Sequence, residues 1–173
     1  IMNLISKISS DETKLNLFYK YFDKFEENHE IAHVIHSLNN DNLKKKTFAA
    51  HIKYYDSKTF SDYLRKLKDD NLRTSEFLLY KNQFPDFRLD WIAHSYPTDE
   101  EQIEVFSKYY NDLNNDLKKE QIPVFIGWLK KDESKVACLD YYSEFVSPEK
   151  MWYITTFLKE EKTKIDILKR YSQ

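Results

Sequence analysis

Two histidines and a glutamate near the amino terminus have the residue types and spacing of a metal-dependent hydrolase. The segment His29-Glu30-Ile31-Ala32-His33 has the pattern H-E-x-x-H. On a helix this spacing places two imidazoles one turn apart, so both can bind one metal ion. The glutamate would then activate a metal-bound water. His36 would lie on the same side of the helix.

The same segment resembles the signature of the zincin metallopeptidases over these five residues only. The resemblance implies zinc bound by His29 and His33, with Glu30 as the general base. Acidic residues precede the motif where zincins usually carry apolar or uncharged ones, and no G-x-x-H extension follows. A zinc-dependent hydrolase is therefore kept as an alternative. The leading interpretation is a solvated polar helix face that holds no metal or cofactor.

The scarcity of glycine excludes other kinds of catalytic site. Gly127 is the only glycine in the chain. Neither a G-x-S-x-G nucleophile elbow nor a glycine-rich phosphate loop can therefore occur. Cys138 is the only cysteine, which excludes an intrachain disulfide. Its place in a helical pattern predicts a buried, unreactive thiol.

The composition favours a helical protein. Among 173 residues, 41% are hydrophobic, and the chain has only 4 prolines beside its single glycine. Sandwiches, barrels and nucleotide-binding folds need glycines at their turns, whereas helices joined by Asn, Asp and Lys turns do not. The net charge of −2 comes from interspersed charges, which is typical of solvated helix faces. No apolar run is long enough to cross a membrane.

Five segments end in one large residue, two further residues and an acid. We use the large residue of each ending as an anchor. The anchors are Leu38, Leu67, Tyr96, Leu129 and Leu158, spaced 29, 29, 33 and 29 residues apart. Before each anchor, apolar or weakly polar residues recur three, four and seven positions back, as on an amphipathic helix. The sets are Ile31, Val34, Ile35, Leu38; Phe60, Tyr63, Leu64, Leu67; Leu89, Ile92, Ala93, Tyr96; Ile122, Phe125, Ile126, Leu129; and Met151, Ile154, Thr155, Leu158. We call these predicted elements the second helices.

Other helical patterns lie between the second helices, and we call them the first helices. Most end in paired aromatics, as at Tyr54-Tyr55 and Tyr141-Tyr142. The expected caps of second helices are Asp56, Ser57, Asp86 and Ser147. Pro85, Pro123 and Pro148 are expected near the starts of second helices, where a missing N–H costs little. The polar stretch 111–119 is expected to connect two helices.

These patterns predict an all-α protein, a short α-solenoid of about five tandem helical hairpins with HEAT- or armadillo-like architecture. A single helical-repeat domain over residues 1–173 is expected, with residues 2–10 and 163–171 at its two ends. Ile1 precedes Met2, which indicates a cloning remnant or a fragment of a longer protein. A cytoplasmic location is the default expectation.

Stacked second helices would build one continuous face with a polar, basic end and an aromatic end. Large aromatic residues with a few cations are typical of surfaces that bind a protein partner. The sequence therefore predicts a non-enzymatic protein–protein interaction module, acting as a scaffold, adaptor or inhibitor. The predicted binding residues are Arg65, Trp91, His94, Trp128, Trp152, Tyr153 and Phe157. The same aromatics could instead pack between neighbouring helices.

Nucleic-acid binding is a further alternative. Lysines recur beside the aromatic ends of the first helices, where they could form a basic ladder next to rings that stack on bases. They are Lys20, Lys53, Lys108 and Lys169. Acidic residues lie close by throughout, so a solvated lysine stripe is the leading interpretation of this ladder.

Overall fold

The computed structural model describes residues 1–171, and over this range every regular element is helical. It contains twelve α-helices, four single-turn 3₁₀ helices and no strand. The α-helices are α1 (Met2–Ile5), α2 (Asp11–Lys20), α3 (Asn28–His36), α4 (Asp41–His51), α5 (Ser57–Arg65), α6 (Asp70–Tyr80), α7 (Leu89–His94), α8 (Asp99–Tyr109), α9 (Asn115–Trp128), α10 (Asp132–Tyr141), α11 (Pro148–Thr156) and α12 (Glu161–Tyr171). The prediction of an all-α protein is confirmed. Within residues 1–171, no helix combines the length and the apolar character that crossing a membrane requires.

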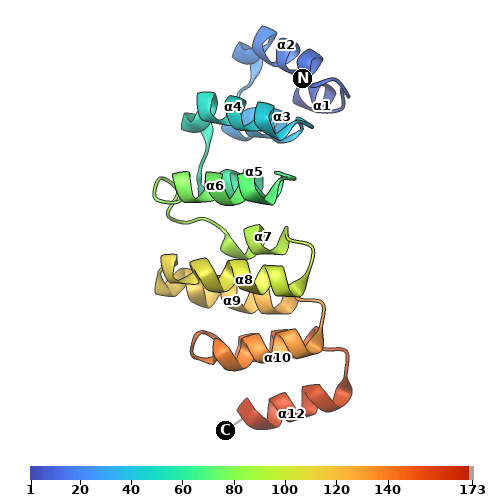
Figure 1. Cartoon of the computed structure of the whole chain (residues 1–173), viewed down its shortest axis with the longest axis vertical. Coiled ribbons are helices and arrows are strands. Elements are labelled where there is room, and N and C mark those ends of the chain that lie inside the picture. The colour runs from blue at the N-terminus through green and yellow to red at the C-terminus, as the bar shows by residue number, and fades with distance from the viewer. Residues whose placement is uncertain (172–173) are drawn as a thin grey trace. The chain divides into compact units, whose positions relative to one another are not determined.

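The chain divides into two compact units, residues 1–87 and residues 88–173. Unit 1 holds α1 to α6, and unit 2 holds α7 to α12 (Figure 1). The single domain expected over residues 1–173 stays a prediction, and its last two residues lie outside the described range.

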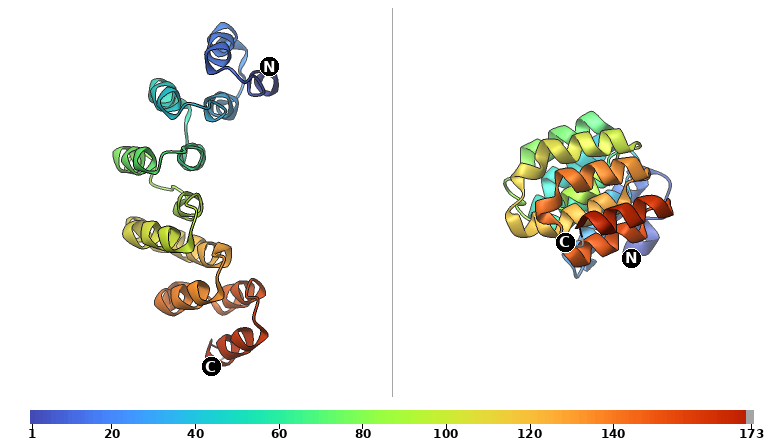
Figure 2. Two further views of the ribbon diagram at one scale, coloured as in Figure 1. Left: turned by 45° about the vertical axis from the view of Figure 1, so that its right-hand side comes forward. Right: turned by 90° about the horizontal axis from the view of Figure 1, so that it is seen from below.

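In both units the second helices lie next to one another. In unit 1, α1 contacts α3 and α3 contacts α5, while α2, α4 and α6 lie beside this layer (Figure 2). In unit 2, α7 contacts α9 and α9 contacts α11. Each second helix also contacts the first helix that follows it, as α7 does with α8 and α11 with α12. Neighbouring second helices can therefore present side chains to a common surface.

The apolar stripes of the second helices form the core. All twenty positions predicted from the anchors are buried, and Tyr96 is the most exposed of them at 8%. Aromatic rings join first to second helices: Phe48 stacks on Tyr63 with centroids 4.1 Å apart, and Phe106 stacks on Phe125 at 4.0 Å. The stripe therefore predicted burial correctly in every second helix. Cys138 is also buried, and burial raises the pKa of its thiol to about 12.

Some predicted helix boundaries are confirmed and others are wrong. Asp56 and Ser147 cap α5 and α11 as expected. Asp86 is not a cap, because α7 begins only after Arg88. Pro123 lies inside α9 instead of near its start. The reason is that the Asn114 side chain accepts the Leu117 N–H at 2.9 Å, which starts the helix within the stretch expected to be a connection.

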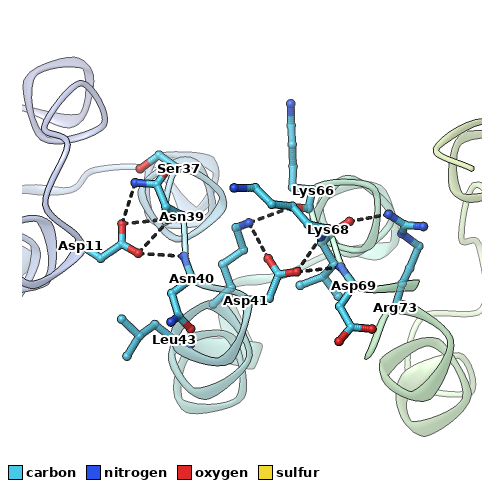
Figure 3. Close-up of polar contacts among 12 residues, drawn as sticks. Asp11, Ser37, Asn39, Asn40, Asp41, Leu43, Lys66, Lys68, Asp69 and Arg73 are labelled. Carbon is cyan, nitrogen blue, oxygen red and sulfur yellow. Dashed lines mark hydrogen bonds and ion pairs between the residues drawn. The ribbon is translucent and has the colours of Figure 1, made fainter. Parts of the chain in front are cut away.

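An aspartate at the start of a first helix binds the chain just after the following second helix. The Asp41 carboxylate accepts the N–H groups of Lys68 and Asp69 at 2.6 and 2.9 Å (Figure 3). Lys44, one turn after Asp41, donates to Asp41 at 3.0 Å and to the Lys66 carbonyl at 2.8 Å. The Lys44 side chain is only 2% exposed, so these two bonds satisfy a buried ammonium.

The same contact recurs at three other first helices, and we call it the aspartate clasp. The clasps are Asp11 with the N–H groups of Asn39 and Asn40, Asp99 with those of Lys130 and Lys131, and Asp132 with those of Lys159 and Glu160. Their distances lie between 2.7 and 3.0 Å. Each clasp joins residues about one predicted hairpin apart. It holds the start of a first helix against the end of the next second helix.

Candidate functional site: an aromatic surface on unit 2

The contact between α9 and α11 includes Gly127, the glycine of α9. A β-carbon built on Gly127 would lie 3.4 Å from the rings of both Tyr153 and Phe157. These two rings meet edge to face with centroids 4.8 Å apart. The helix that carries no side chain at this position therefore supports two aromatic side chains of its neighbour.

The contact between α7 and α9 extends the aromatic surface. The His94 ring lies 5.0 Å from the Trp128 ring. One turn earlier on α7, the Arg88 guanidinium lies over the Trp91 ring at 4.9 Å, a favourable cation–π geometry. Arg88 is itself held by the buried carboxylate of Asp90, at 2.6 Å. We call the six residues Trp91, His94, Trp128, Trp152, Tyr153 and Phe157 the aromatic strip.

The strip is most exposed on α11. Trp152 is 64% exposed, Tyr153 37% and Phe157 39%. Trp91 and Trp128 are half-buried, so part of each ring packs against the protein. Large aromatics that are exposed together on one helix are uncommon in parts of a protein that meet only water. The α11 end of the strip therefore has the exposed apolar area that a partner could cover.

Arg65 is the one predicted binding residue that belongs to unit 1. Its guanidinium binds Asp62, with the shorter contact at 2.6 Å. The other six predicted residues all belong to unit 2. The structure brings His94 and Trp128 together, and likewise Tyr153 and Phe157, whereas Arg65 is part of a separate ion pair.

Replacing Gly127 by alanine is expected to stabilise the fold by roughly 0.5–1 kcal/mol, the difference in helix propensity between the two residues. The added methyl group would meet ring edges at van der Waals distance, and both rings are partly exposed and able to adjust. Urea unfolding of the variant measures this directly. A loss of stability would mean that Tyr153 and Phe157 are held more rigidly than their exposure indicates.

The H-E-x-x-H segment lies on α3, where its glutamate has another role. The Glu30 carboxylate accepts the N–H groups of Glu26 and Glu27 at 2.9 and 3.3 Å. These hydrogen bonds lower the pKa of Glu30 and close the start of the helix, as in a capping box. His29 pairs with Glu27 at 2.8 Å and is exposed, as is His33. No group of three metal-ligating side chains comes together within residues 1–171, so the hydrolase alternative stays a prediction without geometric support.

His36 is directed to α5. Its Nδ1 lies 2.9 Å from Asp62 Oδ2, and its side chain is 8% exposed. Burial lowers the pKa of His36 more than the hydrogen bond and charge of Asp62 raise it. The imidazole is therefore predominantly neutral at pH 7 and joins two second helices of unit 1.

Three lysines of the predicted ladder contact the tyrosine that follows each of them. The ammonium groups of Lys20, Lys53 and Lys108 lie 5.4, 4.9 and 5.3 Å from the ring centroids of the tyrosines that follow them. These lysines and Lys169 are exposed. Such local cation–π pairs are common on helix surfaces and carry no information about nucleic acid.

The aspartate clasp was not predicted from the sequence. An acid three residues after an anchor has the sequence of an ordinary helix start, where a negative charge is favourable. The additional signal is a basic or amide residue three positions later and a Phe or Leu seven positions later, as in Asp41, Lys44 and Phe48. In the clasp helices the residues three and seven positions after the aspartate are buried. This burial distinguishes the clasp from an ordinary helix start with exposed charges.

No protein-family model, no curated protein sequence and no solved structure gives a match to this chain.

Proposed function

We propose that this chain is a non-enzymatic protein-interaction module that binds a partner through the aromatic strip. The observation that carries the proposal is the exposure of Trp152 and Tyr153 on α11 and of Phe157 directly after that helix. Trp and Tyr supply much of the binding free energy in protein interfaces, because they bury a large area and lose little side-chain entropy. The partner would offer apolar side chains on a helix or an extended peptide.

The proposed scaffold for this surface is a short α-solenoid of about five tandem hairpins. It is supported by the twenty buried stripe positions and by the recurrence of the aspartate clasp, twice in each unit. In such an array each hairpin contacts mainly its neighbours, so successive second helices supply successive parts of one binding face. Within unit 2, α9 contacts both α7 and α11, as a middle hairpin of such an array would contact its two neighbours.

A peptide-display selection against the purified full chain tests the proposal. Peptides rich in apolar residues are expected to be enriched, and the Trp152→Ala variant is expected to bind them at least about tenfold more weakly. Its melting temperature should stay near that of the wild type, because the ring is largely exposed. Tyr141→Ala is the matched control: Tyr141 is 68% exposed on the first helix α10, and binding should survive its loss.

Two results would overturn the proposal. Equal binding by wild type and Trp152→Ala would remove the aromatic strip from the interaction. Selection of no peptide, together with salt-sensitive binding of single-stranded nucleic acid, would favour the lysine ladder instead.

A further inference from the structure

Three aromatic side chains surround the last residue of α4 in unit 1. The ring of His51 lies 5.3 Å from those of Phe18 and Phe22, and 5.9 Å from that of Tyr19, measured between centroids. Tyr19 belongs to α2 and is 54% exposed. Its ring therefore covers part of this cluster on the solvent side.

Unit 2 repeats two of these three ring contacts between α8 and the end of α10. Tyr142 is the counterpart of His51, since each follows its clasp aspartate by ten residues. The Tyr142 ring lies 5.9 Å from that of Phe106 and 5.2 Å from that of Tyr110. These two residues follow Asp99 by seven and eleven positions, as the two phenylalanines of unit 1 follow their own clasp aspartate. The two packed first-helix pairs are therefore equivalent at these positions.

The third ring is replaced by a serine. Ser107 follows its clasp aspartate by eight residues, as Tyr19 does, and its Oγ lies 3.0 Å from the Tyr142 hydroxyl oxygen. A hollow of about 390 Å³ lies at this place. An apolar cavity of about 150 Å³ already accepts benzene, so the hollow has room for a substituted ring. The rest of its lining is Ile103, Ala137, Cys138 and Tyr141.

The lining is mainly apolar, with one polar element. Burial raises the pKa of Tyr142 to about 12, so its hydroxyl is protonated at neutral pH. Ser107 and Tyr142 together have two hydroxyl protons, and their mutual hydrogen bond uses one of them. The second proton and the remaining oxygen lone pairs are available to a ligand that carries a hydroxyl group of its own.

The surroundings of the hollow favour a small molecule over a protein partner. Apart from residues that line the hollow, every exposed side chain of α8 and α10 is charged. They are Glu100, Glu104, Lys108, Glu133 and Asp140. The exposed apolar area of these two helices is thus confined to the hollow, whereas a stable protein interface needs about 800 Å² on each partner.

We propose that this hollow binds a small phenol. The aromatic ring of the ligand takes the place that the Tyr19 ring has in unit 1, and its hydroxyl group bonds the pair formed by Ser107 and Tyr142. The tyrosine of unit 1 shows that the fold accepts a phenol ring between two first helices at this position. The site is separate from the aromatic strip and does not depend on the proposed function.

An NMR titration of the ¹⁵N-labelled full chain with p-cresol, the side chain of tyrosine as a free molecule, tests the proposal. The amide signals of Ser107, Ala137 and Tyr141 are expected to shift and to saturate, with a dissociation constant of about 1 mM or lower. Toluene has the same ring without the hydroxyl group. It is expected to bind more weakly than p-cresol, because it leaves the hydroxyl pair without a ligand partner.

The variant Ser107→Tyr gives the hollow the residue of unit 1 and should close it. Binding of p-cresol is expected to weaken at least about tenfold, while the melting temperature stays the same or rises, as in other cavity-filling substitutions. Ser75→Tyr is the matched control, because it adds the same ring to an exposed serine of the first helix α6 in unit 1. This variant should bind p-cresol as the wild type does.

Four outcomes would overturn the proposal. No saturable shift up to about 10 mM p-cresol would leave the hollow without a phenol, and an unchanged affinity in Ser107→Tyr would locate the ligand elsewhere. Shifts confined to Trp128 and Phe157 would place the phenol on the aromatic strip. Equal or tighter binding of toluene would show that the hydroxyl pair takes no part. A short tyrosine-containing peptide is the last comparison, since tighter binding of the peptide than of p-cresol would assign the hollow to a side chain of a partner protein.

Discussion

Replacing Asp41 by alanine is expected to lower the free energy of unfolding by roughly 3–5 kcal/mol, because it leaves a buried charge without its partner. The variant removes the acceptor of two backbone N–H groups, those of Lys68 and Asp69. It also leaves the Lys44 ammonium, 2% exposed, with only a carbonyl to bind. A substitution that leaves a buried donor or charge without a partner is among the few single changes that lower the free energy of unfolding this much.

Urea unfolding followed by circular dichroism measures the loss, and a second substitution separates its causes. Lys44→Met in the Asp41→Ala background should recover part of the stability, because it removes the uncompensated charge while filling a similar volume. Asp116→Ala is the control, since Asp116 is an exposed acid in the first turn of α9. Its cost should stay within about 1 kcal/mol, the usual size of a helix-dipole interaction. Equal losses for Asp41→Ala and Asp116→Ala would refute the clasp as a source of stability.

The second large effect is expected below pH 5, where the protein should lose stability steeply. Burial acts to raise the pKa of each clasp aspartate, but the hydrogen bonds from backbone N–H groups and the charge of nearby lysines together outweigh it and hold the pKa below the ordinary value of 3.8. This holds for all four clasp residues, Asp11, Asp41, Asp99 and Asp132. The contributions of these four carboxylates to the free energy of unfolding should add, because the carboxylates lie in separate contacts.

The direction of the pH effect follows from proton binding. A carboxylate with a lowered pKa in the folded state binds protons more weakly there than in the unfolded chain. Its contribution to the free energy of unfolding is complete above the pKa of about 3.9 in the unfolded chain. This contribution is lost as the pH falls through the pKa of the folded state. The melting temperature should therefore be nearly constant from about pH 7 to 5 and fall between about pH 5 and 2.

Thermal unfolding at a series of pH values checks this expectation. Asp41→Asn and Asp99→Asn should each be less stable at pH 7 and should each lose less on acidification, because the substituted side chain no longer titrates. A wild-type melting temperature that stays constant down to pH 2, or variants with the full wild-type acid response, would show that the clasp carboxylates contribute little.

The second helices show how far local pattern predicts this fold. The stripe at Ile31, Val34, Ile35 and Leu38 is buried in full, and so are its four counterparts. Burial of a helix face is readable from sequence because the helical period places those residues together before any tertiary contact forms. Boundaries were less predictable. Pro123 predicted a helix start, but the cap that starts α9 is Asn114, further upstream.

The candidate site shows where local pattern is insufficient. The sequence indicated that Trp91, Trp128 and Tyr153 lie off the stripe, which left packing between helices and binding of a partner equally open. Only the contacts of α9 with α7 and α11 decide that Trp91 and Trp128 are half-buried while Trp152 is 64% exposed. Exposure of an off-stripe residue depends on the neighbouring helix, and helical periodicity contains no information about that neighbour.

The sequence by itself determined the helical class, the second helices and their buried face, because these follow from composition and from the periodicity of one helix at a time. The tertiary structure alone decided the role of the charged residues. Asp41 and Lys44 have the sequence of an ordinary solvated helix start, yet they bind the chain 27 and 22 residues away. Whether a charged side chain is exposed, paired or buried depends on the residues that pack against it, and this packing exists only once the helices have assembled.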